Sequence, residues 1–146
     1  MSFYKIVFDI SFLSVDLLEP LTTIKSVDLS YCNLSQLQID KLLKSIETYC
    51  RDYGSEPKKI AELSLAGNDL SETCVELLSK CIRCLKGVNL GHTNLSMKQR
   101  SAILQDIMED EHFQMESLDF SASKGNMEYD EELIETFKYQ IKNLKL

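Results

Sequence analysis

Apolar residues return at a fixed spacing in four short segments of this chain. Each segment has an apolar side chain at its first, fourth and sixth positions, and the segments begin at Ile24, Ile60, Leu85 and Met115. Because successive side chains of a strand point to opposite faces, this spacing predicts four short strands with the fourth and sixth residues facing a core. The expected inward pairs are Val27 and Leu29, Leu63 and Leu65, Val88 and Leu90, and Leu118 and Phe120.

A small or polar residue stands at the ninth position of every segment, where the chain leaves the predicted strand. Such a side chain can bond backbone groups that a turn leaves without a ladder partner. Leucine stands at the eleventh position in three of the segments, and Gly125 in the last. The ninth-position residues are Cys32, Asn68, Thr93 and Ser123, and the leucines are Leu34, Leu70 and Leu95.

A serine follows each of these leucines, and apolar residues at helical spacing follow each serine. Ser35, Ser71 and Ser96 are predicted helix N-caps, and two of them have a glutamine three residues later, as in a capping box. The three helices should bury one stripe each. The stripes are Ile39, Leu42, Leu43, Ile46 and Tyr49; Cys74, Leu77, Leu78, Cys81 and Ile82; and Ile103, Leu104 and Ile107. A further stripe of Leu133, Ile134, Phe137, Ile141 and Leu144 predicts a C-terminal helix.

The four strand phrases, each with its turn and helix, resemble the ribonuclease-inhibitor-like leucine-rich repeats. First positions at 24, 60, 85 and 115 leave room for a full helix in each repeat. The resemblance implies an α/β fold: a leucine-rich repeat solenoid, a right-handed β-α superhelix shaped as a short horseshoe, with parallel strands on the concave side and helices on the convex side. The alternative is an open doubly wound sheet, whose strand ends would be expected to carry ligand-binding glycines.

We expect one domain over residues 1–146. Residues 1–23 would form an N-terminal cap or degenerate repeat, with a strand near residues 4–10 and a short helix containing Leu17, Leu18 and Leu21. Residues 24–125 would form the core repeats, with a polar loop over 51–59. Residues 126–146 would form a C-terminal capping helix.

The charge distribution excludes some classes of partner. The chain has a net charge of -7, and residues 105–146 hold eleven acidic side chains against four basic ones. Phosphate neutralisation needs a basic face, so we expect no nucleic-acid partner. No stretch approaches the roughly 20 apolar residues of a membrane span, and the start of the chain does not resemble a signal peptide. We expect no membrane partner.

Five cysteines, an odd number, lie mostly within apolar patterns, which is typical of free thiols in a reducing compartment. A cytosolic or nuclear location is therefore expected. Cys81 and Cys84 have the spacing of zinc ligands, but a second pair is missing, so we expect no metal.

The sequence shows none of the usual arrangements of catalytic side chains. The only histidines are His92 and His112, and neither has an evident nucleophile beside it. The glycines after the second and third strand segments lack the second glycine and the lysine of a phosphate-binding loop. We expect a protein that is not an enzyme, with no catalytic residue and no cofactor.

The outward residues of the predicted strands, with the residues at the strand ends, are the candidate site. They are small or acidic, and such a surface admits a partner's backbone and attracts basic side chains. We expect Asp28, Glu62, Asn89 and Asp119 to form one row across the sheet, with Tyr31 and His92 as anchors at the strand ends. The candidate partner-binding residues are Asp28, Ser30, Tyr31, Glu62, Ser64, Asn89, His92 and Asp119.

The function favoured by this pattern is a noncatalytic protein–protein interaction module, acting as an adaptor, an inhibitor or an assembly factor. Its concave face would bind a protein partner that carries a basic segment. The resemblance leaves two alternatives open: a regulatory subunit or activator of an enzyme such as a small GTPase, and a tropomodulin-like cytoskeletal binding domain. A further alternative is that the sheet face is only solvated. The sequence predicts no particular oligomeric state.

Overall fold

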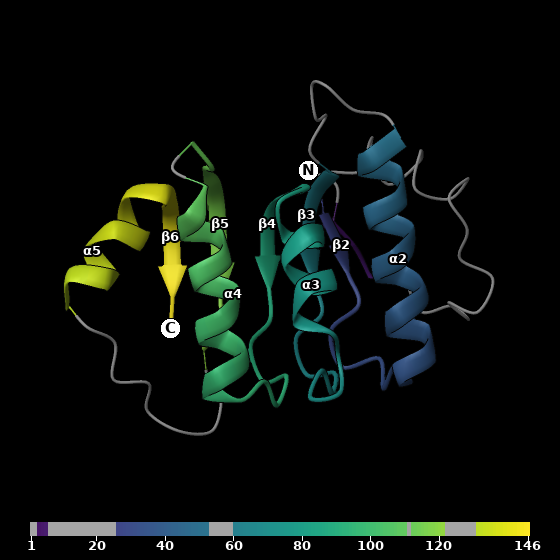
Figure 1. Cartoon of the computed structure of the whole chain (residues 1–146). Coiled ribbons are helices and arrows are strands. Elements are labelled where there is room, and N and C mark those ends of the chain that lie inside the picture. Colours follow the sequence, from purple (N-terminus) through teal and green to yellow (C-terminus); the bar gives the residue numbers. More distant parts are fainter. Residues whose placement is uncertain (1–2, 6–25, 53–59, 111, 122–130) are drawn as a thin grey trace.

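The computed structural model describes residues 3–5, 26–52, 60–110, 112–121 and 131–146. In this part of the chain, strands and helices alternate (Figure 1). The strands are β1 (Phe3–Lys5), β2 (Ser26–Asp28), β3 (Ile60–Ser64), β4 (Leu85–Asn89), β5 (Met115–Asp119) and β6 (Ile141–Lys145). The helices are α2 (Gln36–Asp52), α3 (Val75–Ile82), α4 (Met97–Glu109) and α5 (Glu131–Gln140).

The six strands form one parallel sheet in which spatial order equals sequence order. Val27 pairs with Leu63, Leu63 with Val88, and Val88 with Leu118. This register confirms the alignment of the four predicted strand segments. The N-terminal strand expected near residues 4–10 is described over Phe3–Lys5, beside β2.

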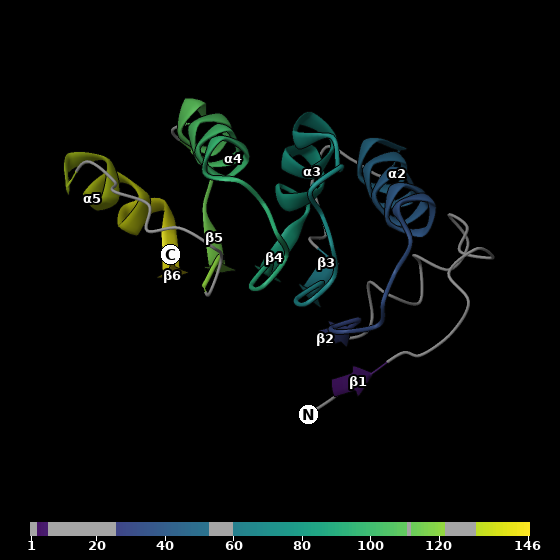
Figure 2. The same cartoon turned by 90° about the horizontal axis from the view of Figure 1, so that it is seen from below.

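All four described helices lie on one face of the sheet, on the outer side of its curve (Figure 2). No described helix lies on the other face of the strands. A doubly wound sheet would have helices on both faces, so the arrangement of the described elements contradicts that alternative. The α/β class with a parallel sheet is confirmed.

The core lies between the sheet and the helices and runs the length of the sheet. The eight predicted inward strand residues are all buried, as are the α2 and α4 stripes over their described positions. In α3 the prediction is wrong at one position, because Cys74 is exposed and stands just before the helix. No described helix has both the length and the apolar character that crossing a membrane requires.

Two of the three predicted N-caps are confirmed. Ser35 and Gln38 exchange both capping-box hydrogen bonds, at 2.8 and 3.2 Å, and Ser96 and Gln99 do the same at 2.8 and 3.1 Å. The prediction for Ser71 is wrong, since α3 begins only at Val75.

Asp69 explains the delayed start of α3. The Ser71 hydroxyl and backbone N–H both donate to the Asp69 carboxylate, at 2.6 and 3.0 Å, and these bonds lower the pKa of Asp69. Position 74, where a capping box needs Glu or Gln, is a cysteine.

The C-terminal region differs most from the prediction. Instead of one capping helix, α5 ends at Gln140, and Ile141–Lys145 form β6 against β5. Ile141 and Leu144 therefore belong to a strand. The signal was present in the sequence, because Ile141, Leu144 and Leu146 repeat the first, fourth and sixth apolar positions of the other strand phrases.

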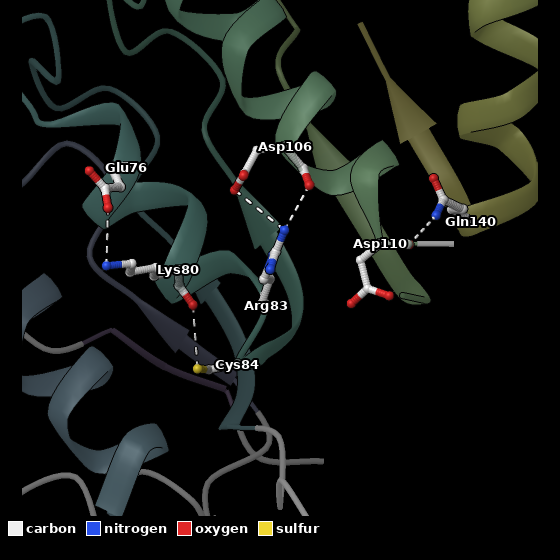
Figure 3. A network of polar contacts seen from close by, with 7 residues as sticks. All are labelled: Glu76, Lys80, Arg83, Cys84, Asp106, Asp110 and Gln140. Carbon is white, nitrogen blue, oxygen red and sulfur yellow. Dashed lines mark hydrogen bonds and ion pairs between the residues drawn. The ribbon is translucent and has the colours of Figure 1, made fainter. Parts of the chain in front are cut away.

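Polar contacts join neighbouring repeats at the amino edge of the sheet (Figure 3). Arg83, in the turn before β4, donates from Nη2 to the carbonyl oxygen of Asp106 in α4 at 2.7 Å, and lies 3.6 Å from its carboxylate. Gln140 at the end of α5 donates to the carbonyl oxygen of Asp110 at 2.7 Å. These contacts tie α4 to the repeats on both sides of it.

The cysteines are not uniform. Cys32, Cys74 and Cys81 are free thiols, whereas Cys84 is disulfide-bonded, which corrects the expectation for Cys84. The Cys84 sulfur lies 3.5 Å from the Lys80 carbonyl oxygen (Figure 3), and as a disulfide sulfur it has no hydrogen to donate there. The helix expected around Leu17, the loop over 53–59 and the turn positions 123 and 125 lie outside the described residues.

Candidate functional site

The open face of the sheet forms a groove of about 570 Å³, lined by strands β2 to β6. Six of the eight candidate residues line it. They are Asp28, Ser30, Glu62, Ser64, Asn89 and Asp119. The structure therefore brings these six residues, which span 92 positions of sequence, onto one surface.

The groove contains two rows of outward residues rather than the single acidic row that was expected. Asp28 pairs with Ser64, Ser64 with Asn89, and Asn89 with Asp119, at the fifth position of each strand phrase. Glu62 occupies the third position, and its partner in β4 is Gly87. The prediction that Glu62 shares a row with Asp28 and Asp119 is wrong, because a difference of two residues moves a side chain to the next row on the same face.

The fifth-position row, called the carboxyl-end row below, lies toward the carboxyl ends of the strands. Its side chains form hydrogen bonds to the backbone of the turns. Asp28, Asn89 and Asp119 each accept, through Oδ1, the backbone N–H two residues later, at 2.8, 2.9 and 2.7 Å. Ser64 accepts from Ala66 in the same way at 3.4 Å. One oxygen of each aspartate carboxylate thus stabilises the strand exit through its hydrogen bond to the turn.

The third-position row carries small side chains around a single carboxylate. Gly87 in β4 lies between Glu62 and Ser117 in the register. A Cβ at Gly87 would overlap the Ser117 hydroxyl and lie 3.1 Å from Cγ of Glu62. The floor of the groove is therefore close-packed around Gly87.

Two residues of the groove lining were not predicted from the sequence, and both belong to β6. Asn143 pairs with Ser117, and Lys145 pairs with Asp119, so Lys145 closes the carboxyl-end row. Lys5 of β1 pairs with Asp28 in the same way, so lysine stands beside aspartate in the register at both ends of this row. The missed signal is the fifth strand phrase, beginning at Ile141.

A buried asparagine supports the turns at the carboxyl edge. The Asn68 amide donates to the carbonyl oxygens of Leu29 and Leu65, at 2.8 and 3.0 Å, and its oxygen accepts from the backbone N–H of Leu34 at 3.1 Å. Thr93 holds the next turn by donating to Leu90 at 2.6 Å. These bonds confirm the role predicted for the ninth position.

Tyr31 and His92 lie outside the groove lining, at the carboxyl edge of the sheet. Their ring centroids are 6.3 Å apart and the planes are tilted by 46°. Gly67 occupies the equivalent position in the strand between them, and a Cβ there would overlap the Tyr31 ring. The two predicted anchors therefore meet across Gly67, although 60 residues separate them in sequence.

Charged and hydrogen-bonding side chains line this surface. The groove lining holds three carboxylates, those of Asp28, Glu62 and Asp119, and one ammonium group, that of Lys145. Among the described residues, no three histidine, cysteine or acidic side chains gather closely enough to hold a metal ion. Comparison with protein-family models, with curated protein sequences and with solved structures finds no match to this chain.

Proposed function

We propose that this chain is a noncatalytic protein-interaction module of the leucine-rich repeat type, whose groove holds a basic segment of a partner protein. The repeat assignment is supported by the recurrent strand phrase, now counted five times, and by strands that follow sequence order. The helices on one face also agree with it (Figure 2).

The observation that carries the proposal is the acidic groove on the open sheet face. Three carboxylates share it with serine, glycine and asparagine side chains, so a partner's backbone can approach the sheet closely. Asp28 and Asp119 lie on β2 and β5, three strand spacings apart, which is roughly 14 Å. An extended segment covers this distance in about four residues. We expect lysine or arginine side chains at that spacing in the partner.

The test uses a fluorescent peptide with lysines four residues apart, and measures its affinity by fluorescence polarisation. The variant Asp28→Asn, Glu62→Gln, Asp119→Asn removes the charges and keeps the oxygen that each aspartate uses in its turn. Asn89 makes this same hydrogen bond in the native chain, so the amide fits the position. We expect affinity to fall roughly tenfold in the variant, and to fall with added salt in the native protein.

A matched control removes three exposed carboxylates outside the groove, through Glu72→Gln, Glu76→Gln and Glu109→Gln. This control changes the net charge by the same amount, so a loss of binding through overall charge alone would appear in both proteins. Equal affinities for the two triple variants would contradict the groove as the binding site. Thermal melting of both variants confirms that they fold.

A further inference from the structure

We propose that Tyr31 and His92 form an arginine-selective anchor at the carboxyl edge of the groove. In this inference, which rests on the proposed function, a guanidinium group of the partner segment stacks on the Tyr31 ring beside His92. The carboxylates of the groove attract any basic side chain. The aromatic pair distinguishes arginine from lysine.

The two rings stand at equivalent points of successive strand exits. Tyr31, Gly67 and His92 each lie three residues after the last residue of their strands, β2, β3 and β4. Their backbone N–H groups donate to carbonyl oxygens of the next turn, at 2.8, 3.0 and 3.2 Å. This ladder of hydrogen bonds holds the three residues side by side at the edge of the sheet.

All three residues have a left-handed backbone, with φ of 55°, 72° and 54°. Glycine adopts this conformation readily, whereas an aromatic residue adopts it at a cost in conformational energy. The middle position is glycine, and it leaves the space above its α-carbon to the Tyr31 ring. A side chain at Gly67 would displace the ring from His92, so the pair depends on this glycine.

The Tyr31 ring remains open to a ligand after these contacts. Tyr31 is 65% exposed, and His92 is exposed as well. Burial therefore does not account for two aromatic rings at this edge. Tyr31 contacts His92 and Gly67, and much of its ring still faces solvent.

Charge complementarity identifies the occupant as a cation. Ser30, which precedes Tyr31, lines the groove, and its backbone N–H is bonded to the Asp28 carboxylate. The aromatic surface thus adjoins the part of the groove that holds the Asp28 carboxylate. A cation over an aromatic face beside carboxylates is favourable, and the planar guanidinium of arginine stacks where the compact, strongly hydrated lysine ammonium does not.

The experiment compares two fluorescent peptides of equal length and charge, one carrying arginine and one carrying lysine at the same positions. We expect native protein to bind the arginine peptide about fivefold more tightly. Tyr31→Asn removes the ring with a residue that tolerates the left-handed backbone, and should abolish this preference without changing the affinity for lysine. Tyr31→Phe should keep the preference.

The control is Tyr139→Asn, which removes another exposed tyrosine from α5, 82% exposed, and should leave both affinities unchanged. His92→Asn should weaken the preference, because the guanidinium keeps only one ring. Equal binding of both peptides to native protein would overturn the arginine anchor and leave the acidic groove standing. Absence of binding by both peptides would overturn the anchor and the proposed function together.

Discussion

At the scale of single residues, polar side chains with several backbone partners hold the carboxyl edge of the sheet together. Asn68 joins two repeats, since it bonds to Leu29 and Leu34 of one and to Leu65 of its own. The aspartates and Asn89 of the groove each hold one turn. These groove side chains therefore both stabilise the turns and line the open surface. A variant that tests their charge must keep their hydrogen bonds to the turns.

Asn68→Ala should lower the free energy of unfolding by roughly 2–4 kcal/mol, because the Leu29 carbonyl oxygen and the N–H of Leu34 lose the Asn68 amide as a partner. Denaturant unfolding measures the change. Asn143→Ala is the control, since Asn143 is exposed. A loss below 0.5 kcal/mol, about the size of an ordinary surface change, would show that water replaces the Asn68 amide.

The Cys81 thiol should be unreactive in the folded chain. Burial raises its pKa from 9.0 to about 12, with the charge of Glu47 adding to the shift. Above pH 9 the unfolded chain releases this proton while the folded chain retains it, so stability falls as the pH rises from 9 towards 12. We expect a thiol reagent at pH 8.5 to modify exposed Cys74 much faster than Cys81.

Unfolding measured at pH 8 and pH 10.5 tests the same group. Native protein should lose more stability over this interval than Cys81→Ala, which has no thiol to titrate. Equal losses would contradict the raised pKa.

At the scale of helices and strands, local signals placed most boundaries correctly. The capping boxes at Ser35 and Ser96 predicted the starts of α2 and α4, because both partners of each box lie within four residues. Ser71 failed as a cap because Asp69 competes for its hydroxyl. The end of α5 was missed because the apolar residues of β6 also fit a helical stripe over a short stretch.

Ser96→Ala should lower the free energy of unfolding by about 1 kcal/mol, through loss of the N-cap. Ser71→Ala should cost less than half as much, because its hydroxyl caps no helix. Denaturant unfolding of the two variants compares them directly. If Ser71→Ala proved the more damaging substitution, the start of α3 at Val75 would be in error.

At the scale of the whole molecule, one core runs through the described part of the chain from β2 to β6. The buried cluster includes residues from Val27 in β2 to Ile141 in β6, without a break at any repeat. Neighbouring strands and helices share this one core, so damage at its centre should affect the elements on both sides. The opposite face of the sheet carries the groove with its three carboxylates, and no described helix packs on that face.

Leu90→Ala should therefore lower the free energy of unfolding by roughly 2–5 kcal/mol, since Leu90 is fully buried just after β4. The matched change Leu146→Ala, at a residue 40% exposed at the end of the sheet, should cost far less. Calorimetry of both variants measures the difference. Similar melting temperatures for Leu90→Ala and the native chain would contradict the central core.

The sequence by itself determined the strand phrases, their inward residues, the polar turn positions and two helix starts. These features depend on periods of two and about 3.6 residues, which are local and legible along one chain. Most of the candidate site was predictable for the same reason, because outward positions follow from inward ones.

Only the tertiary structure decided which of these residues meet. It moved Glu62 out of the row of Asp28 and Asp119, added Lys145 to the groove, and brought Tyr31 to His92 over Gly67. The physical reason is that strand register and ring contacts join positions far apart in sequence. A local period places a residue on a face, whereas the hydrogen-bonded pairing of separate strands chooses its neighbours.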